Sequence, residues 1–448
     1  MTDVVVDETR TTDGPGPGRP VSKGVLIAIA AGFVAIGVLS VAFGKGSYAL
    51  GALGFVVALL ISVTLHEGGH FLTARRYGMK ATQFFVGFGP TVWSKQTGET
   101  EWGVKAIPAG GFVKIVGMTS LEETDPKDED RAFYKQPAGQ RAVVLAAGST
   151  VHFILAVLIV LLSAMSIGKA VETSPDIGAL SECVTAAADG SCQDAGSVAA
   201  PARGAGLQVG DTVVSVGGQR TDDRLQFIQA VRGYPGRPVE IVVERDGAQR
   251  AVTITPVAVQ RESLTVEGRI DTVGAIGVAP QGRQGTERLG PVEAVGHSVD
   301  EMGRIVTGIW TTFSEKVGTI TQVYGEDRDP EGFIGVLGAT RISGEVIASE
   351  ETAGFKLLGF LGLIAGLNFF VGVFNLLPLL PLDGGHLAVL AFEQARDRVK
   401  RLFGYRGDLL RVDLTRLLPL TYAVVLFFAG FTIWLLGADI VNPIRLNG

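Results

Sequence analysis

The 448-residue chain is too apolar for an ordinary soluble protein. Hydrophobic residues make up 47% and there are 61 glycines, whereas charged residues make up only 19%, against roughly 25% in soluble domains. The net charge of −6 argues against nucleic acid as a partner, because nucleic-acid-binding domains carry basic surfaces. Two cysteines are too few for a cysteine-based zinc or iron–sulfur site. We therefore expect a membrane protein in which His, Asp or Glu binds any metal.

Five apolar segments are long enough to cross a bilayer, which takes about 20 residues of helix. Residues 1–22 are rich in Pro and Gly, and we expect them to form a disordered tail. The next segment, within residues 23–45, is too long to be the core of a signal peptide. The sequence therefore predicts an α-helical membrane protein with about five transmembrane helices, at residues 25–43, 48–65, 142–168, 357–382 and 417–438.

The Lys and Arg residues of the loops predict how the chain is oriented. They collect in residues 73–141 and again in residues 396–416. Positively charged loops stay in the cytoplasm, so both segments are expected on the cytoplasmic face of the cell membrane. The N-terminus is then inside, and residues 169–356 are outside.

The outer segment contains the pattern of a small β-rich α+β domain, within residues 169–285. The turn at residues 205–211, AGLQVGD, precedes an alternating strand at 212–216, a helix at 223–232 and further strands at 239–245 and 249–257. This order resembles a PDZ domain, which binds an extended peptide by strand addition. The alternative is a β-rich domain that binds no peptide. Residues 286–353 are expected to be an outer connecting segment.

The two cysteines of the chain, Cys183 and Cys192, lie in this outer segment, nine residues apart. Extracytoplasmic compartments are oxidising and permit disulfides. The pair therefore forms either a disulfide that closes the short loop or two free thiols.

The strongest chemical signal is His66-Glu67-Gly-Gly-His70 at the end of the second apolar segment. On a helix, imidazoles at i and i+4 share one face and can reach one Zn²⁺, with the intervening Glu67 as general base. The alternative is a polar helix end at the membrane interface. A third His ligand six residues after His70, as in some soluble zinc proteases, is absent, because that position is Arg76.

The third ligand must therefore come from a distant part of the chain, and the candidate is Asp383. It follows the fourth apolar segment, which crosses in the same direction as the second, so both motifs reach a similar depth. Pro378 and Pro381 interrupt the helix, and Gly384 permits a tight turn. The alternative is that Asp383 caps the helix that follows.

These motifs together resemble the site-2 protease family of intramembrane zinc metalloproteases over nearly all of residues 48–440. The resemblance implies one Zn²⁺ per chain bound by His66, His70 and Asp383, with Glu67 as general base. It also implies that Asn375, in the stretch NLLPLLPLDGG, assists substrate binding. Further matches at residues 85–90 and 107–114 imply a membrane-associated β-hairpin beside the active site. The catalytic core would then comprise residues 46–168 and 354–440.

One departure from the family pattern is His152, which stands where an Asn is expected. It could support the metal site without binding the metal, be an ordinary core histidine, or bind the metal itself. The extra span at residues 23–45 is a second departure.

The resemblance implies regulated intramembrane proteolysis of a membrane-anchored regulator, such as an anti-sigma factor, by a protease embedded in the lipid bilayer. Two alternatives belong to other classes. A non-catalytic scaffold would capture peptides through the PDZ-like domain and would not need Glu67. A metal transporter would use the His and Asp residues as a transit site.

Overall fold

The computed structural model describes residues 45–118, 124–184, 198–264, 268–325, 328–329, 332–407 and 411–445. The chain divides into two compact units. The first comprises residues 1–165, 290–350 and 359–448, and the second comprises residues 166–289 and 351–358. The predicted N-terminal tail and the predicted span at residues 25–43 lie outside the described residues.

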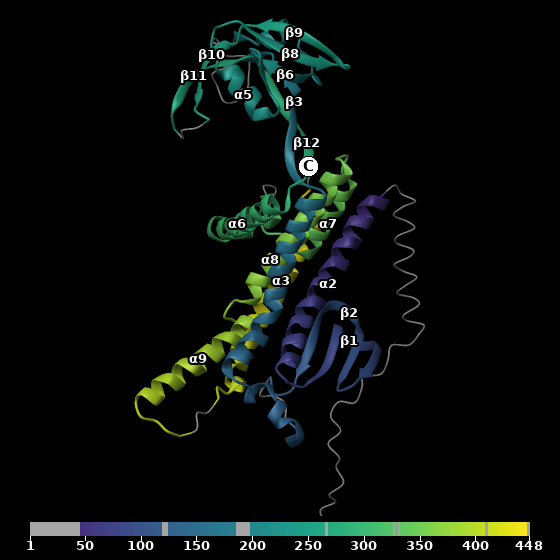
Figure 1. Ribbon diagram of the computed structural model, residues 1–448, viewed down its shortest axis with the longest axis vertical. Coiled ribbons are helices and arrows are strands. Elements are labelled where there is room, and N and C mark those ends of the chain that lie inside the picture. The colour runs from purple at the N-terminus through teal and green to yellow at the C-terminus, as the bar shows by residue number, and fades with distance from the viewer. Residues whose placement is uncertain are drawn as a thin grey trace, which may run out of the picture. The chain divides into compact units, whose positions relative to one another are not determined.

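Among the described residues, four helical segments are long and apolar enough to cross a membrane. They are α2 (Gly46–Arg76), α3 (Ala138–Ser166), α8 (Ala353–Asn375) and the segment Leu414–Val441, in which η4 (Leu414–Leu417) leads into α10 (Leu418–Val441). Figure 1 shows α2, α3 and α8 running along one another. These four coincide with the second to fifth predicted spans, and the chain is a multi-pass membrane protein.

The fourth span ends earlier than the sequence predicted. Helix α8 stops at Asn375, and a turn leads to a separate helix, α9 (Asp383–Leu402). Pro378 and Pro381 lie in the turn. Proline donates no backbone hydrogen bond and its ring clashes with the preceding helical turn, so the helix cannot continue.

A β-hairpin connects α2 to α3. Its strands are β1 (Ala81–Thr97) and β2 (Thr100–Ile115), which form an antiparallel two-stranded sheet. The register is irregular, because residues 83–86 pair both with 111–114 and with 101–104. The first half of β1 therefore lies between the two halves of β2. Two short 3-10 turns, η1 (Pro126–Arg131) and η2 (Phe133–Lys135), precede α3.

A hydrophobic cluster fixes the hairpin beside the C-terminal end of α2. Phe71 packs edge-on against Trp102, with ring centroids 4.8 Å apart. The remaining buried members come from α2, the turn after it, the hairpin, η2, α3 and α9: Ala74, Met79, Ala81, Phe84, Ile115, Phe133, Val144, Leu145 and Leu390. Burying each large side chain stabilises the arrangement by about 1.5–3 kcal/mol, so the ends of these elements are held together next to the His66–His70 segment.

Residues 290–350 form part of the helical unit, whereas the sequence suggested only a connecting segment at 286–353. They form α6 (Pro291–Glu315), η3 (Val317–Tyr324) and α7 (Val336–Ala348), and α7 packs on α2. Arg328 makes a buried ion pair with Asp439 of α10, at 2.9 Å. Asp439 also accepts hydrogen bonds from the backbone of Gly335 and Gly338. Because a buried charge is stable only when it is paired, these bonds tie the segment before α7 to α10.

The second unit is β-rich, as predicted. Its elements are β3 (Lys169–Leu180), β4 (Cys183–Val184), β5 (Val198–Ala199), α4 (Pro201–Gly204), β6 (Thr212–Val216), β7 (Gln219–Arg220), α5 (Arg224–Arg232), β8 (Val239–Arg245), β9 (Ala248–Ile254), β10 (Val257–Glu262), β11 (Ile270–Ala275) and β12 (Val278–Glu287). The main sheet has the order β12-β3-β6-β8-β9, with β7 paired to β6. Alternate residues of β8, two buried valines of β6 and one face of α5 form the core around Ile241, Val216 and Phe227.

The predicted strands β6 and β8 have the expected bounds, and α5 begins one residue later because Asp223 is its N-cap. The last predicted strand ends at Ile254 rather than at residue 257, since Pro256 cannot donate to the ladder. Asp211 ends the predicted turn and is buried in an ion pair with Arg245. Cys183 is disulfide-bonded, and Cys192, its partner in one of the two alternatives that the sequence left open, lies outside the described residues.

Candidate metal centre

Helix α2 carries His66 and His70 on one buried face. The helix continues unbroken through both residues to Arg76, so the spacing of four places the imidazoles one turn apart. Gly69 lies between them at the contact with α3, where an added Cβ would stand 2.9 Å from the carbonyl oxygen of Ala147. The glycine therefore allows α2 and α3 to approach closely.

A backbone carbonyl of α3 fixes the orientation of His70. Its Nδ1 lies 2.7 Å from the carbonyl oxygen of Val144. A carbonyl can only accept a hydrogen bond, so Nδ1 carries the proton and a neutral His70 presents a lone pair at Nε2. Partners of this kind orient the histidine ligands of metal sites.

The turn between α8 and α9 places Asp383 beside His66 and His70. Asp383 is the first residue of α9, and Leu382 is the N-cap, so the capping role considered for Asp383 is not what the structure shows. Gly384 and Gly385 lie directly against the turn, where an added Cβ would stand 2.2 Å from the carbonyl oxygen of Leu376 and 2.5 Å from the carbonyl carbon of Leu379, respectively. Only glycine fits at these two positions, and this tight packing holds the carboxylate in place.

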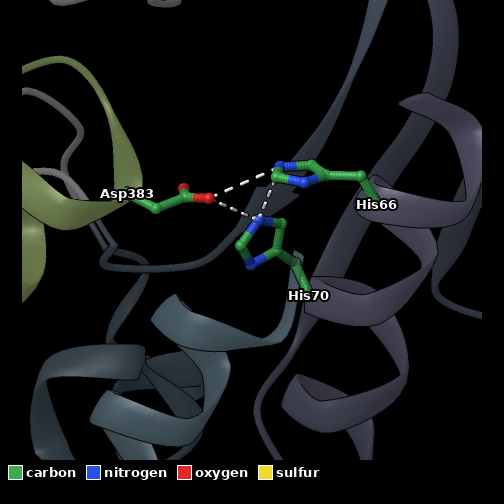
Figure 2. A group of neighbouring side chains, drawn as sticks. All are labelled: His66, His70 and Asp383. Carbon is green, nitrogen blue, oxygen red and sulfur yellow. Dashed lines mark hydrogen bonds and ion pairs between the residues drawn. The ribbon is translucent and has the colours of Figure 1, made fainter. Parts of the chain in front are cut away.

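One donor atom from each of His66, His70 and Asp383 lies close to the other two (Figure 2). Nε2 of His66 lies 3.2 Å from Nε2 of His70, and Oδ2 of Asp383 lies 3.4 Å and 3.3 Å from these two nitrogens. In a tetrahedral site with zinc–ligand bonds of about 2.0–2.1 Å, neighbouring ligand atoms are about 3.3–3.4 Å apart. The distances between the three atoms therefore match those along one face of such a tetrahedron.

The hydrogen-bonding groups of His66, His70 and Asp383 also indicate that a cation binds between them. Oδ2 of Asp383 is buried, and no described residue donates a hydrogen bond to it. A proton on Nε2 of His66 could serve one neighbour, but the lone pair of His70 would still face the carboxylate oxygen at 3.3 Å. An ion between the three atoms turns each repulsion into an attraction, so the residues fit Zn²⁺.

Gly148 of α3 leaves the space that an ion needs. A Cβ at this position would stand 2.5 Å from Nε2 of His70 and 2.4 Å from Cε1 of His66. Distances below 3.0 Å require the neighbours to move. Any side chain at residue 148 would therefore intrude on the donor atoms, a constraint that the sequence alone did not reveal.

Glu67 is half-buried and faces the hairpin. The backbone N–H of Val113 donates a hydrogen bond to its carboxylate, and an added Cβ on Gly111 would stand 3.2 Å from Cγ of Glu67. The second half of β2 therefore lies against the residue predicted to be the general base.

His152 lies beside the three donors but is not one of them. The group that could bind an ion among the described residues comprises His66, His70 and Asp383. The ring of His152 is buried, with its centroid 4.9 Å from that of His66. His152 therefore lies next to the three donors, and its supporting role stays a prediction.

The partner of His152 is Asn368, which sequence reasoning missed. Asn368 is buried in α8, and its Nδ2 donates to the carbonyl of Ile364, at 2.9 Å. Its Oδ1 therefore accepts a hydrogen bond from Nδ1 of His152, also at 2.9 Å. Asn375 is half-buried at the end of the same helix, two turns later and on the same side. The sequence did contain a signal for Asn368, because it is an amide in an apolar helix, two turns before the predicted Asn375.

The comparisons with known proteins agree with this chemistry. Residues 54–405 match peptidase family M50. The zinc metalloprotease Rip1 of Mycobacterium tuberculosis is 37% identical over 417 residues, which cover 89% of this chain and 99% of that protein. The Rip1 of Mycolicibacterium smegmatis is 36% identical over 419 residues, with the same coverage. A putative zinc metalloprotease of Mesorhizobium japonicum is 29% identical over 399 residues, covering 85% of this chain and 96% of that protein.

Proposed function

Because the chain belongs to peptidase family M50 and is an intramembrane zinc metalloprotease, we propose that His66, His70 and Asp383 bind its one Zn²⁺. The observation that supports this assignment is the triangle of donor atoms with sides of 3.2–3.4 Å. Asp383 lies more than 300 positions after His66 and His70 in the chain, and the packing of α9 against the turn that precedes it brings its carboxylate to them.

Glu67 is the general base and acid of the proposed reaction. Zinc bound by the three donor atoms would supply Lewis acidity. Glu67 takes a proton from the attacking water and later returns it to the leaving amine. The hydrogen bond from Val113 holds the carboxylate on the side of the hairpin, where the lack of a side chain at Gly111 leaves room for Cγ of Glu67.

The substrate is proposed to bind as an extended strand along β2. Residues 107–115 pair with the first half of β1 along one edge, and among the described strands nothing pairs with the other. Edge strands accept an added strand. A transmembrane helix must unwind to expose its peptide bonds, since its carbonyls are engaged one turn away. Strand pairing next to Glu67 would hold the unwound segment, and Asn375 would assist.

The β-rich unit is proposed to be a PDZ-like domain on the extracytoplasmic side. The charged loops at residues 73–141 and 396–416 support this orientation, and the order β6, α5, β8 supports the PDZ-like fold. The domain would bind a newly formed C-terminus or exclude bulky ectodomains. Both roles suit a protease that cuts a membrane-anchored regulator, such as an anti-sigma factor, after an earlier cut outside.

Metal removal provides the test of this function. We expect the purified protein in liposomes to cleave a single-span model substrate that has only a short extracytoplasmic stub. A chelator should abolish cleavage, and stoichiometric Zn²⁺ should restore it, with product size followed on gels. Cleavage that persists in the metal-free protein would contradict the proposal. Zinc flux into liposomes without cleavage would favour a transporter.

A further inference from the structure

Helix α9 has two halves with different surroundings. The first half begins at Asp383 and is fixed to the helical unit. Leu390 is buried in the hydrophobic cluster, and Glu393 bonds to Arg141 at 3.2 Å and to the backbone N–H of Val412 at 2.9 Å. From residue 398 onward every residue of the helix is exposed, and in Figure 1 this end of α9 projects away from α2, α3 and α8.

The exposed half of α9 carries an apolar stripe. Phe392, Val399 and Leu402 are 60%, 51% and 84% exposed, and Phe403, which follows the helix, is 87% exposed. At about 100° per residue, the first three of these side chains fall within an arc of about 80° that also contains Ala395. A stripe of large exposed side chains marks a surface that contacts something apolar.

Cations border this stripe. Arg398 lies at one edge of the arc, and Arg396 and Lys400 lie at the other, by the same helical spacing. Residues 396–406 contain five Lys or Arg residues and one Asp. Arg396 is paired with Asp397, whereas Arg398 and Arg401 are exposed. A helix with an apolar stripe between cationic edges is the pattern of a helix that lies in a membrane interface.

We propose that the apolar stripe and its bordering cations, within residues 392–403 at the end of α9 and just after it, dock on the surface of the surrounding bilayer and bind anionic lipid headgroups. The helix is attached to the membrane at both ends, through α8 before it and α10 after it, so docking is an intramolecular event with a high effective concentration. Charge complementarity selects anionic headgroups over zwitterionic ones. The proposal requires that α8 and α10 cross the membrane, and it does not depend on the assignment of the zinc ligands.

Spin-label accessibility tests the proposal on the full-length protein. A nitroxide is attached at Ala395→Cys, on the stripe, or at Gln394→Cys, on another side of α9, with the protein lacking an introduced cysteine as the blank. The protein is placed in nanodiscs of phosphatidylcholine with or without phosphatidylglycerol. With phosphatidylglycerol present, the label at 395 should collide mainly with oxygen, and the label at 394 mainly with a water-soluble nickel chelate.

Variants that remove cations from α9 measure the electrostatic contribution to docking on anionic lipid. Each cation near an anionic surface contributes roughly a fivefold preference, so Arg398→Gln/Lys400→Gln/Arg401→Gln should weaken docking about a hundredfold. The matched control is Arg250→Gln/Arg261→Gln/Arg288→Gln, three exposed arginines of the β-rich unit, which should leave docking unchanged.

Several outcomes would overturn the proposal. One such outcome is that the label at 395 stays accessible to the nickel chelate in every lipid mixture. Another is that this label is immersed in the bilayer equally with and without phosphatidylglycerol. Spin–spin broadening that disappears on dilution would show that a second copy of the chain covers the stripe instead. Zinc content and cleavage are measured in the same samples. If the enzyme is active but α9 is exposed to water, the docking of α9 is refuted and the proposed function is not.

Discussion

Replacing Glu67 with Gln should reduce substrate cleavage by about 10²–10⁴-fold while the protein keeps about one zinc per chain. Glutamine has nearly the same shape and can still accept the hydrogen bond from Val113, but it cannot take a proton from water. Because Glu67 is not one of the three converging donors, metal binding should survive. Cleavage rate and zinc content are measured on the same preparation.

The matched control is Glu240→Gln, an exposed residue of β8 in the β-rich unit. It should leave both quantities unchanged. A Glu67→Gln variant that retains full activity would remove Glu67 from the mechanism. One that loses its zinc would show that Glu67 supports the ligands rather than the proton transfer.

Gly148→Val should eliminate most of the zinc binding without changing any ligand. The new Cβ would lie 2.5 Å from Nε2 of His70, so the imidazoles must move or the metal must leave. Overpacking of this kind costs about 1–3 kcal/mol, which corresponds to about a fivefold to 150-fold loss of zinc affinity, and cleavage should fall with it. Zinc is measured by mass spectrometry, and helix content by circular dichroism.

Gly139→Val on the same helix is the control, because an added Cβ there meets nothing within 4 Å. Both substitutions place a β-branched residue in α3, so a shared loss of helix would be seen in both. Equal zinc content in the two variants would mean that Gly148 does not border the metal.

The sequence alone was sufficient for the parts of the site that depend on local geometry. His66 and His70 are four residues apart on a continuous helix, so their common face follows from the helical repeat. Asp383 could be placed near them because the second and fourth predicted spans cross in the same direction and the prolines predicted an interruption of the helix just before it. In the β-rich unit, alternation predicted the bounds of β6 and β8, and in β8 alternate residues are indeed buried.

Features that arise from packing between distant segments were not predicted. Gly148 matters because α3 crosses α2 at His66 and His70, and no periodicity reveals that contact. Asn368 is one polar residue within an apolar helix, and its role becomes clear only from the 2.9 Å bond to His152. Residues 290–350 are too polar to read as spans, yet α7 packs on α2 and Arg328 neutralises Asp439.

Zinc stoichiometry tests the central claim most directly, which is that two motifs more than 300 residues apart form one metal site. The detergent-purified protein, His66→Ala and Asp383→Ala are dialysed against the same low zinc concentration and analysed by mass spectrometry. We expect about one zinc per chain in the unaltered protein and a large loss in both variants. Full zinc with unchanged affinity in Asp383→Ala would contradict the account, because the third ligand would then lie elsewhere.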